Sequence, residues 1–444
     1  MRPSFVVIIA DDMARDLFGA GHRYPFLELP NLDRLAARGV LFDRAFVTTS
    51  LCSPSRATML SGLYAHTHGV LGNEARDLAP GTATYPQLLQ QAGYKTAFVG
   101  KWHMDSSKDT PRPGFDYWVS FKGQGVYEDP TLDENGKSVK RTGYITDILT
   151  DYALHWLQAR GNEPFLLVLS HKAAHDPFHP APRHAAALGG ASLPMPTSFE
   201  DSFFTKPAWQ RRYVMCGGSA ADLAHCPDPP PGSLPAWPWR GREPWRLDYL
   251  RTLLALDDSV GSIVATLQNQ GLAESTYVVF VGDNGMFLGE HRLGDKRLMY
   301  EESIRVPFLV AGPRVVVRRS SALVLNLDLA PTLLALAGVA IPGSMQGRSL
   351  AGLVAGGPPV RDSFLYEYFA DPVVPAIPTM VGVRTERWAY VTYPGRGSEE
   401  ELYDLDNDPS EMTSLSDAPA SASSRLALRG ELQRLLAATG APPL

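Results

Sequence analysis

Short apolar segments recur along the chain and alternate with longer amphipathic ones. The apolar runs have the length of strands, and they are residues 5–10, 95–99, 165–170, 277–281 and 306–310. The segments between them carry apolar residues every three or four positions, which is typical of helices packed on a sheet. These helical patterns are residues 31–38, 84–92, 146–160 and 248–270. The alternation predicts an α/β fold with helices on both faces of a sheet.

Two segments depart from this alternation. Residues 192–245 lack clear periodicity and are rich in Pro and Trp, so we expect an ordered excursion that is either a substrate-pocket wall or a packed surface loop. Its notable residues are Trp209, Arg211, Arg212, residues 229–231, Trp237, Trp239, Arg240, Arg242 and Trp245. After about residue 355, short strands alternate with turns up to a final helix at residues 423–439. We therefore predict a main domain of residues 1–355 and a smaller C-terminal subdomain of residues 356–444.

Composition and charge narrow the possible partners. The chain has 444 residues, of which 44% are hydrophobic and 20% charged, as in ordinary water-soluble globular proteins. Its net charge of -6 offers no overall attraction to nucleic acid or anionic lipid, so an anionic substrate must be attracted locally. No apolar run approaches the roughly 20 residues of a membrane-spanning helix. We expect a cytoplasmic protein if Met1 is the native start, and a periplasmic or secreted one if a signal peptide was removed.

The chain has three cysteines, Cys52, Cys216 and Cys226, which is too few for a disulfide scaffold. We expect Cys52 to be the unpaired thiol. A bridge between Cys216 and Cys226 is compatible with their spacing, but two reduced structural cysteines are the expectation for a cytosolic protein.

Carboxylates follow two of the predicted strands. Asp11 and Asp12 come directly after residues 5–10, and their mutual repulsion would raise at least one pKa unless a cation were bound. Asp283 and Asn284 follow the predicted strand at residues 277–281, and they add two more of the oxygen ligands that Ca²⁺ or Mg²⁺ prefers. Either pair alone could be a helix cap or a turn. Together they predict a metal site at the carboxyl edge of the sheet.

Cys52 begins the run Cys-Ser-Pro-Ser-Arg, which precedes a helical pattern at residues 57–61. A cysteine near a helix N-terminus could be a low-pKa thiolate nucleophile. It could equally be a buried, inert thiol.

Residues 51–62, LCSPSRATMLSG, resemble the signature of type I sulfatases of the alkaline-phosphatase-like superfamily. In that family the cysteine is oxidised to formylglycine by a formylglycine-generating enzyme, and one hydroxyl of the hydrated aldehyde attacks sulfur. The resemblance implies that Cys52 is a precursor and that Arg56 supports the diol and the anionic ligand. It also implies a mixed central sheet flanked by helices, with a small C-terminal α+β subdomain that contains an antiparallel sheet.

Three further stretches match the family in the expected order. The resemblance assigns Lys101 and His103 to sulfate binding and diol activation, and their period-two spacing predicts the same side of a strand end. It places His175 near the diol and the leaving oxygen, with His171 and His179 as weaker candidates. Lys296 matches the lysine that bridges sulfate and leaving oxygen. The implied cation is Ca²⁺, with Mg²⁺ or Mn²⁺ possible, held by Asp11, Asp12, Asp283 and Asn284.

Residues 115–118, 123–127 and 170–178 resemble the branch that contains N-acetylglucosamine-6-sulfatases and related glycan sulfatases. The resemblance implies a carbohydrate sulfate ester as substrate, with aryl sulfates as artificial substrates. His291, Arg384 and Glu367 are candidates for sugar contacts or for structural salt bridges.

Three alternatives remain. A phosphonate monoester or phosphodiester hydrolase can use the same nucleophile. An alkaline-phosphatase-like enzyme with two transition metals needs a Ser or Thr nucleophile and further His and Asp ligands, which are not visible in the sequence. A non-catalytic glycan-binding protein could keep the fold, but the intact set of Cys52, Arg56, Lys101, His103, His175 and Lys296 argues against it. The sequence indicates no oligomeric state.

Overall fold

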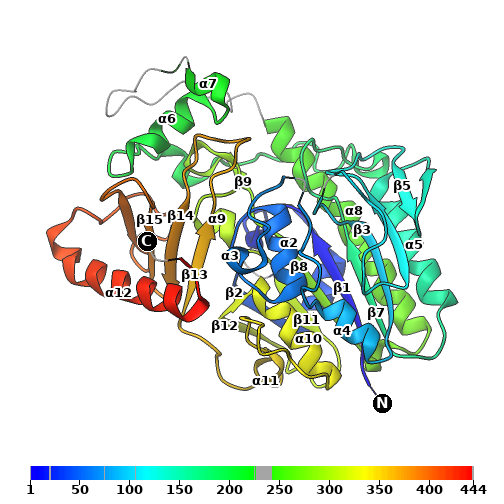
Figure 1. Cartoon of the computed structure of the whole chain (residues 1–444). Coiled ribbons are helices and arrows are strands. Elements are labelled where there is room, and N and C mark those ends of the chain that lie inside the picture. Colours follow the sequence, from blue (N-terminus) through cyan, green and yellow to red (C-terminus); the bar gives the residue numbers. More distant parts are fainter. Residues whose placement is uncertain are drawn as a thin grey trace.

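The protein is described by a computed structural model over residues 2–19, 22–74, 76–105, 107–224, 226 and 243–442. Within these residues, ten strands form one mixed sheet (Figure 1). In sheet order they are β12 (Arg318–Leu325), β2 (Gly39–Phe46), β11 (Phe308–Ala311), β8 (Thr276–Gly282), β1 (Ser4–Ala10), β7 (Phe165–Ser170), β3 (Lys95–Lys101), β4 (Tyr117–Phe121), β5 (Thr131–Glu134) and β6 (Lys137–Lys140). The strands from β8 to β4 are parallel, whereas β11 runs antiparallel to both of its neighbours.

Helices cover both faces of this sheet, as predicted (Figure 1). On one face lie α2 (Cys52–Ser61), α4 (Tyr85–Gln91) and α10 (Leu329–Ala337), and on the other lie α1 (Pro30–Ala36), α5 (Ile145–Ala159) and α8 (Glu243–Asn269). Alternate residues of β1 serve the two cores: Phe5, Val7 and Ile9 pack with the first set of helices, and Val6 and Ile8 pack with the second. Strand β1 is buried on both faces because it lies in the middle of the sheet.

The five predicted strands and four predicted helices all exist; β7 has the predicted ends, and the ends of the others are shifted. Helix α2 begins at Cys52 itself, earlier than the predicted pattern, because Pro54 is tolerated in a first helical turn. Helix α8 begins at Glu243 instead of residue 248. Strand β11 begins after Pro307, which cannot donate a backbone hydrogen bond.

A second, antiparallel sheet follows the first, as the resemblance implied. Its strands are β13 (Ser363–Tyr368), β14 (Met380–Thr385), β15 (Trp388–Thr392) and β16 (Glu400–Asp404), and α12 (Ala422–Thr439) packs against it. The sheet shares one hydrophobic core with the end of β2, where the ring centres of Phe46 and Phe364 lie 5.0 Å apart. The domain boundary at residue 355 stays a prediction.

Short elements complete the fold. They are η1 (Arg15–Leu17), α3 (Ala65–His68), η2 (Pro182–His184), η3 (Thr197–Glu200), α6 (Ala208–Cys216), α7 (Ala220–Ala224), η5 (Ala273–Ser275), β9 (Phe287–Leu288), η6 (Glu290–Arg292), β10 (Gly294–Asp295), α9 (Glu301–Ile304), η7 (Asn326–Asp328), α11 (Ala351–Val354) and η8 (Pro419–Ser421). In the part of the chain that the structure describes, no helix has both the length and the apolar character of a membrane span.

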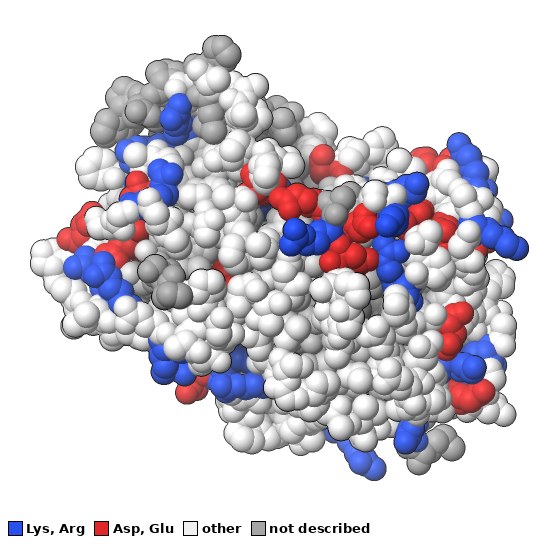
Figure 2. All heavy atoms as spheres, viewed as in Figure 1, with Lys and Arg blue, Asp and Glu red and all other residues white. Residues whose placement is uncertain are grey.

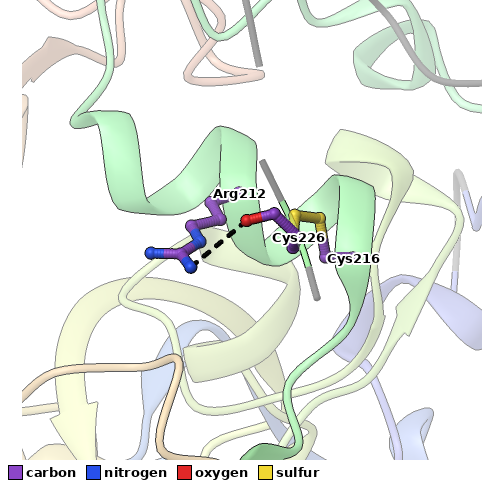
Figure 3. The surroundings of a disulfide bond; sticks show 3 residues. All are labelled: Arg212, Cys216 and Cys226. Carbon is purple, nitrogen blue, oxygen red and sulfur yellow. Dashed lines mark hydrogen bonds between the residues drawn. A yellow bond between two sulfur atoms is a disulfide. The ribbon is translucent and has the colours of Figure 1, made fainter. Parts of the chain in front are cut away.

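The excursion at residues 192–245 contains helices α6 and α7 and a disulfide. Cys216 and Cys226 are bridged with their Cα atoms 5.9 Å apart, and Arg212 donates a 3.3 Å hydrogen bond to the carbonyl of Cys226 (Figure 3). The expectation of two reduced cysteines is therefore wrong. Outside the described residues lie residues 229–231, Trp237, Trp239, Arg240 and Arg242.

Candidate active site

The parallel strands β1, β3, β7 and β8 end at one edge of the sheet, and α2 begins there. Asp11 and Asp12 follow β1, Lys101 ends β3, and Asp283 follows β8. Carboxyl ends of neighbouring parallel strands meet at the same edge, so residues distant in sequence come together here. Figure 2 shows acidic and basic side chains gathered toward this upper edge, whereas the surface over α4 and α10 is largely uncharged.

Cys52 is fully buried at the first position of α2, and its thiol lies 3.8 Å from Oδ1 of Asp11. Burial raises the pKa of the thiol to about 12, although Lys101 and Lys296 act in the opposite direction. Of the two alternatives for the unmodified thiol, the raised pKa favours the buried one, because loss of hydration outweighs the helix N-terminus.

Arg56 links three strand ends. Its Nε and Nη2 contact Oδ2 of Asp283 at 3.0 and 2.8 Å, and its Nη1 donates to the carbonyl of Lys101 at 2.7 Å and to Oγ of Ser170 at 2.6 Å. Burial alone would lower the pKa of Arg56, but Asp283 and Asp11 raise it overall. Because Arg56 follows Cys52 by four residues, one helical turn places both on the same side of α2.

Two lysines contact the carboxylates that follow β1. Lys101 pairs with Asp11, and Lys296 pairs with Asp12. Burial would raise the pKa of Asp11, but Lys101, His175 and Arg56 together hold it well below its usual value. Burial likewise opposes the charge of Lys296, yet Asp12 raises the pKa of that lysine well above its usual range. Lys296 is therefore charged within the site.

The oxygen atoms of this cluster fit a divalent cation. Asn284 donates from Nδ2 to Asp12 Oδ1 at 2.6 Å, while its buried Oδ1 has no hydrogen-bond partner among the described residues. Asp283 has its pKa raised to about 7, first by burial and then by Asp11, which is the conflict a cation relieves. Ligand atoms of Asp11, Asp12, Cys52 and His175 all lie within 4.8 Å of one another. The described residues thus include a possible metal-binding cluster, in which Asp11 and Asp12 supply the hard oxygen donors.

His103 does not continue the alternation of β3, which ends at Lys101. Its φ of 60° turns the chain, so the predicted arrangement of Lys101 and His103 along one strand end is wrong. The ring Nδ1 instead lies 3.4 Å from Oγ of Ser53, the residue after Cys52. Burial, with Lys101 next, strongly lowers the pKa of His103.

His175 lies beside Asp12, with Nε2 3.7 Å from Oδ2, and its side chain is 14% exposed. Burial, followed by Lys101, lowers its pKa to about 4. Two residues that sequence reasoning missed support this loop. Tyr127 donates from its hydroxyl to the carbonyl of His175 at 2.8 Å, and Lys172 lies 4.7 Å from the Tyr127 ring. Both belong to stretches that resemble the family, but no sequence signal marks a buried lysine.

The weaker candidates all contact other protein groups, so their roles with substrate stay predictions. The contacts are His171 with Ser259 (3.0 Å), His179 with the ring of Tyr127 (6.2 Å), His291 with Asp201 (2.7 Å), Glu367 with His66 (2.7 Å) and Arg384 with Glu301 (2.8 Å). Arg211 bonds to the carbonyls of Phe203 and Lys206 at 3.0 and 3.3 Å.

Family comparison agrees with this geometry. The protein-family model for sulfatases matches residues 3–339. This chain belongs to the sulfatase family. A second family model, for the C-terminal region of N-sulphoglucosamine sulphohydrolase, matches residues 289–438 of this sulfatase.

Curated relatives share most of the sulfatase's length. N-acetylglucosamine-6-O-sulfatase of Bacteroides thetaiotaomicron is 32% identical over 470 residues, covering 93% of this chain and 82% of that protein. N-acetylglucosamine-6-sulfatase of Homo sapiens is 30% identical over 411 residues, covering 85% of this chain and 70% of that protein. The chain is therefore a sulfuric ester hydrolase.

Solved structures share its fold. An enzyme in complex with its substrate D-glucosamine-2-N,6-O-disulfate superposes with a TM-score of 0.88 at 30% identity, covering 99% of this chain and 98% of that one. The phosphonate monoester hydrolase of Agrobacterium radiobacter superposes with a TM-score of 0.76 at 22% identity, covering 99% and 96%. The second similarity shows a common fold and no more.

Proposed function

We propose that this sulfatase hydrolyses sulfate monoesters of carbohydrates and also accepts artificial aryl sulfates. The named relatives and the glucosamine disulfate complex support a carbohydrate substrate. The observation that carries the proposal is the surrounding of Cys52, where Arg56, Lys101 and Lys296 bring positive charge to a buried atom that touches Asp11. Such a concentration of cations matches the charge of a sulfate group.

Residue 52 is proposed to act after its thiol has been oxidised to formylglycine by a formylglycine-generating enzyme. Hydrated formylglycine supplies two hydroxyl groups on one carbon, one to attack sulfur and one to allow sulfate release as the aldehyde re-forms. A thiol or a serine has no second hydroxyl. The first turn of α2 also favours negative charge at this position, because its amides lack helical partners.

Asp11, Asp12, Asp283 and Asn284 are proposed to hold one divalent cation, Ca²⁺ or alternatively Mg²⁺ or Mn²⁺. Such a cation supplies positive charge that neutralises sulfate oxygens. Arg56 fixes Asp283, which is proposed to accept the proton of the attacking hydroxyl. Lys101 is proposed to bind the sulfate, and His103 to promote its release.

Lys296 and His175 are proposed to assist the departing alcohol. When the bond from sulfur to the alcohol oxygen breaks, its electron pair stays on that oxygen, which then needs a proton or a nearby positive charge. Both side chains contact Asp12, so they face the same region of the site.

Mass spectrometry of the peptide across Cys52 tests the modification, and turnover of 4-nitrophenyl sulfate tests the activity. Cys52→Ala is expected to abolish turnover. Cys52→Ser is expected to accumulate a covalently sulfated enzyme, visible as the added mass of one sulfuryl group, because serine can attack but cannot eliminate sulfate. Full activity of either variant, or of protein with an unmodified thiol, contradicts the formylglycine mechanism.

A substrate panel separates the carbohydrate proposal from the alternatives. The panel contains glucosamine 6-sulfate, 4-nitrophenyl sulfate, a phosphodiester and a phosphonate monoester. We expect the two sulfates to have the highest kcat/KM. A faster phosphonate or phosphodiester would favour the other use of the same nucleophile, and activity on aryl sulfate without any sulfated sugar would remove the carbohydrate proposal.

A further inference from the structure

The segment that carries Lys296 has an unusual backbone. It runs from β9 through η6 and β10 and then into α9. The positive φ angles are those of Gly289 (111°), His291 (48°), Arg292 (55°), Asp295 (94°) and Arg297 (86°). Only glycine adopts such angles without a steric penalty, so the four other residues keep them only where surrounding contacts hold them.

The first set of contacts that fixes the loop is made by His291, whose side chain is fully buried. Its Nδ1 lies 2.7 Å from Oδ2 of Asp201, and Nζ of Lys206 lies 2.5 Å from the same oxygen. Burial, with the charge of Lys206 next, lowers the pKa of His291 to about 4, so the ring is neutral and its Nδ1–H can donate to Asp201. Asp201 and Lys206 are also fully buried, which leaves this pair no water to replace a lost partner.

An aromatic ring, that of Tyr300, also contacts both His291 and Lys206. The ring of His291 stacks on Tyr300 at 4.4 Å, and Nζ of Lys206 lies 4.4 Å from the centre of the same ring. The hydroxyl of Tyr300 lies within hydrogen-bonding distance of two acceptors, Oε1 of Gln210 in α6 at 2.8 Å and Oε2 of Glu401 in β16 at 2.9 Å. The loop that ends at Tyr300 is therefore tied to the excursion and to the second sheet.

A second set of contacts fixes the next residue of the loop, Arg292. Arg292 packs 4.5 Å from the ring of Phe199 and reaches Glu200 at 3.5 Å. Both partners come from the same excursion segment as Asp201. Two adjacent left-handed residues, His291 and Arg292, are thus held from one side by residues 199–206.

We infer that Asp201 and Lys206 are positioning residues for Lys296: they hold His291, and with it the left-handed backbone that directs Lys296 to Asp12. This inference rests on the role proposed above for Lys296 in departure of the leaving group. Residues 199–206 of the excursion would therefore position the loop that carries Lys296 without contacting the substrate.

Leaving-group dependence separates positioning from general stability. A poor leaving group such as phenolate needs charge stabilisation on its oxygen far more than 4-nitrophenolate does. Displacement of Lys296 therefore slows phenyl sulfate more than 4-nitrophenyl sulfate. A smaller folded fraction slows both substrates by the same factor. The ratio of the two kcat values is thus independent of how much enzyme is folded.

The test measures this ratio in the full-length, formylglycine-containing enzyme. Lys296→Ala sets the reference, with an expected loss on phenyl sulfate about 100-fold greater than on 4-nitrophenyl sulfate. For Asp201→Asn we expect an extra loss of about 10-fold on phenyl sulfate. Asp201→Asn/Lys206→Met removes both buried charges and so avoids an unpaired ammonium if the single variant folds poorly. His291→Asn keeps a residue that tolerates positive φ and removes the ring.

Asp258→Asn is the matched control, because Asp258 also pairs with a histidine, His184, at 2.7 Å but does not touch the Lys296 loop. Its ratio should equal that of the wild type. Equal losses on both substrates in the Asp201 and His291 variants would overturn the inference. If Lys296→Ala itself leaves the ratio unchanged while the wild type is active, the proposed role of Lys296 fails instead.

Discussion

Two segments deliver charged groups to the same site by opposite means. Helix α2 presents Cys52 and Arg56 from a regular helix in which all ten residues are buried. The loop of residues 289–297 presents Lys296 from a backbone with five positive φ angles and a single two-residue strand, β10, which pairs with β9. The helix fixes its groups with main-chain hydrogen bonds, whereas the loop depends on side chains from other parts of the chain.

The difference concerns where the stabilising energy comes from. In α2 the distance between Cys52 and Arg56 follows from helical periodicity, so no distant residue has to set it. In the loop, each left-handed residue other than glycine costs roughly 1 kcal/mol or more. That cost is offset by buried contacts such as Asp201 with His291. The loop should therefore be the more easily displaced of the two.

The largest expected effect comes from Arg56→Lys on the helix. Lysine cannot reproduce the separate contacts of the guanidinium with Asp283, the carbonyl of Lys101 and Ser170. We expect kcat to fall by about 100-fold or more and the free energy of unfolding to fall by roughly 2 kcal/mol. Steady-state kinetics and urea unfolding measure these changes.

Arg387→Lys provides the control. Arg387 also makes a bidentate contact, from Nε and Nη2 to the carboxylate of Asp404 at 2.7 and 2.5 Å, but its side chain is 48% exposed. Because solvent screens this exposed pair, the free energy of unfolding and kcat should both stay close to those of the wild type. Comparable losses in the two variants would show that the helix delivers nothing special to the site.

A matched glycine pair tests the comparison directly. Gly62 ends α2 with φ 66°, and Gly289 opens the loop with φ 111°. An added Cβ would meet a flexible methionine side chain at 3.3 Å in both cases, Met345 and Met195 respectively. Crowding is thus similar, and only the surrounding backbone differs.

We expect Gly62→Ala to cost about 1 kcal/mol of unfolding free energy while kcat changes less than about two-fold. Gly289→Ala should cost roughly 2 kcal/mol and lower kcat about 10-fold, because the loop then shifts Lys296. Thermal unfolding and kcat per folded enzyme are the measurements. If Gly62→Ala lowers kcat as much as Gly289→Ala, the helix is no more rigid a support than the loop.

The same contrast explains what the sequence could predict. Helix and strand periodicity located the main sheet, and the run Cys52 to Arg56 placed two side chains one turn apart. His103 shows the limit: period-two spacing assumed that β3 continued, but the chain turns at a φ of 60°. The backbone of the Lys296 loop was equally invisible, because positive φ at His291 or Arg297 arises from tertiary contacts and leaves no local pattern.

The sequence also could not predict which residues far apart along the chain contact each other. The sequence predicts His291 and Glu367 as sugar contacts or as members of structural salt bridges, and only the structure identifies their partners, Asp201 and His66. Pairings over such separations follow from packing, which no spacing along the chain reports. For the same reason, the sequence made the disulfide between Cys216 and Cys226 only the less expected of two alternatives.

Two histidines should change the free energy of unfolding with opposite dependences on pH. His66, next to α2, contacts Glu367 at 2.7 Å and the carbonyl of Thr439 at 3.0 Å. Burial lowers its pKa, but Glu367 outweighs burial and raises it overall. Its stabilisation is therefore full below about pH 6.5 and is lost as pH rises through the raised pKa. His291, with its pKa lowered to about 4, stabilises fully above about pH 6.5 and loses this contribution as pH falls toward 4.

Unfolding free energies of wild type, His66→Gln and His291→Asn between pH 5 and 9 measure these contributions. The difference between wild type and His66→Gln should shrink above neutral pH, whereas the difference for His291→Asn should shrink below pH 6.5. One proton changes the slope by at most about 1.4 kcal/mol per pH unit. Each variant is the control for the other. Two differences that change in the same direction would mean that the histidine beside the helix and the histidine in the loop are held by the same kind of contact.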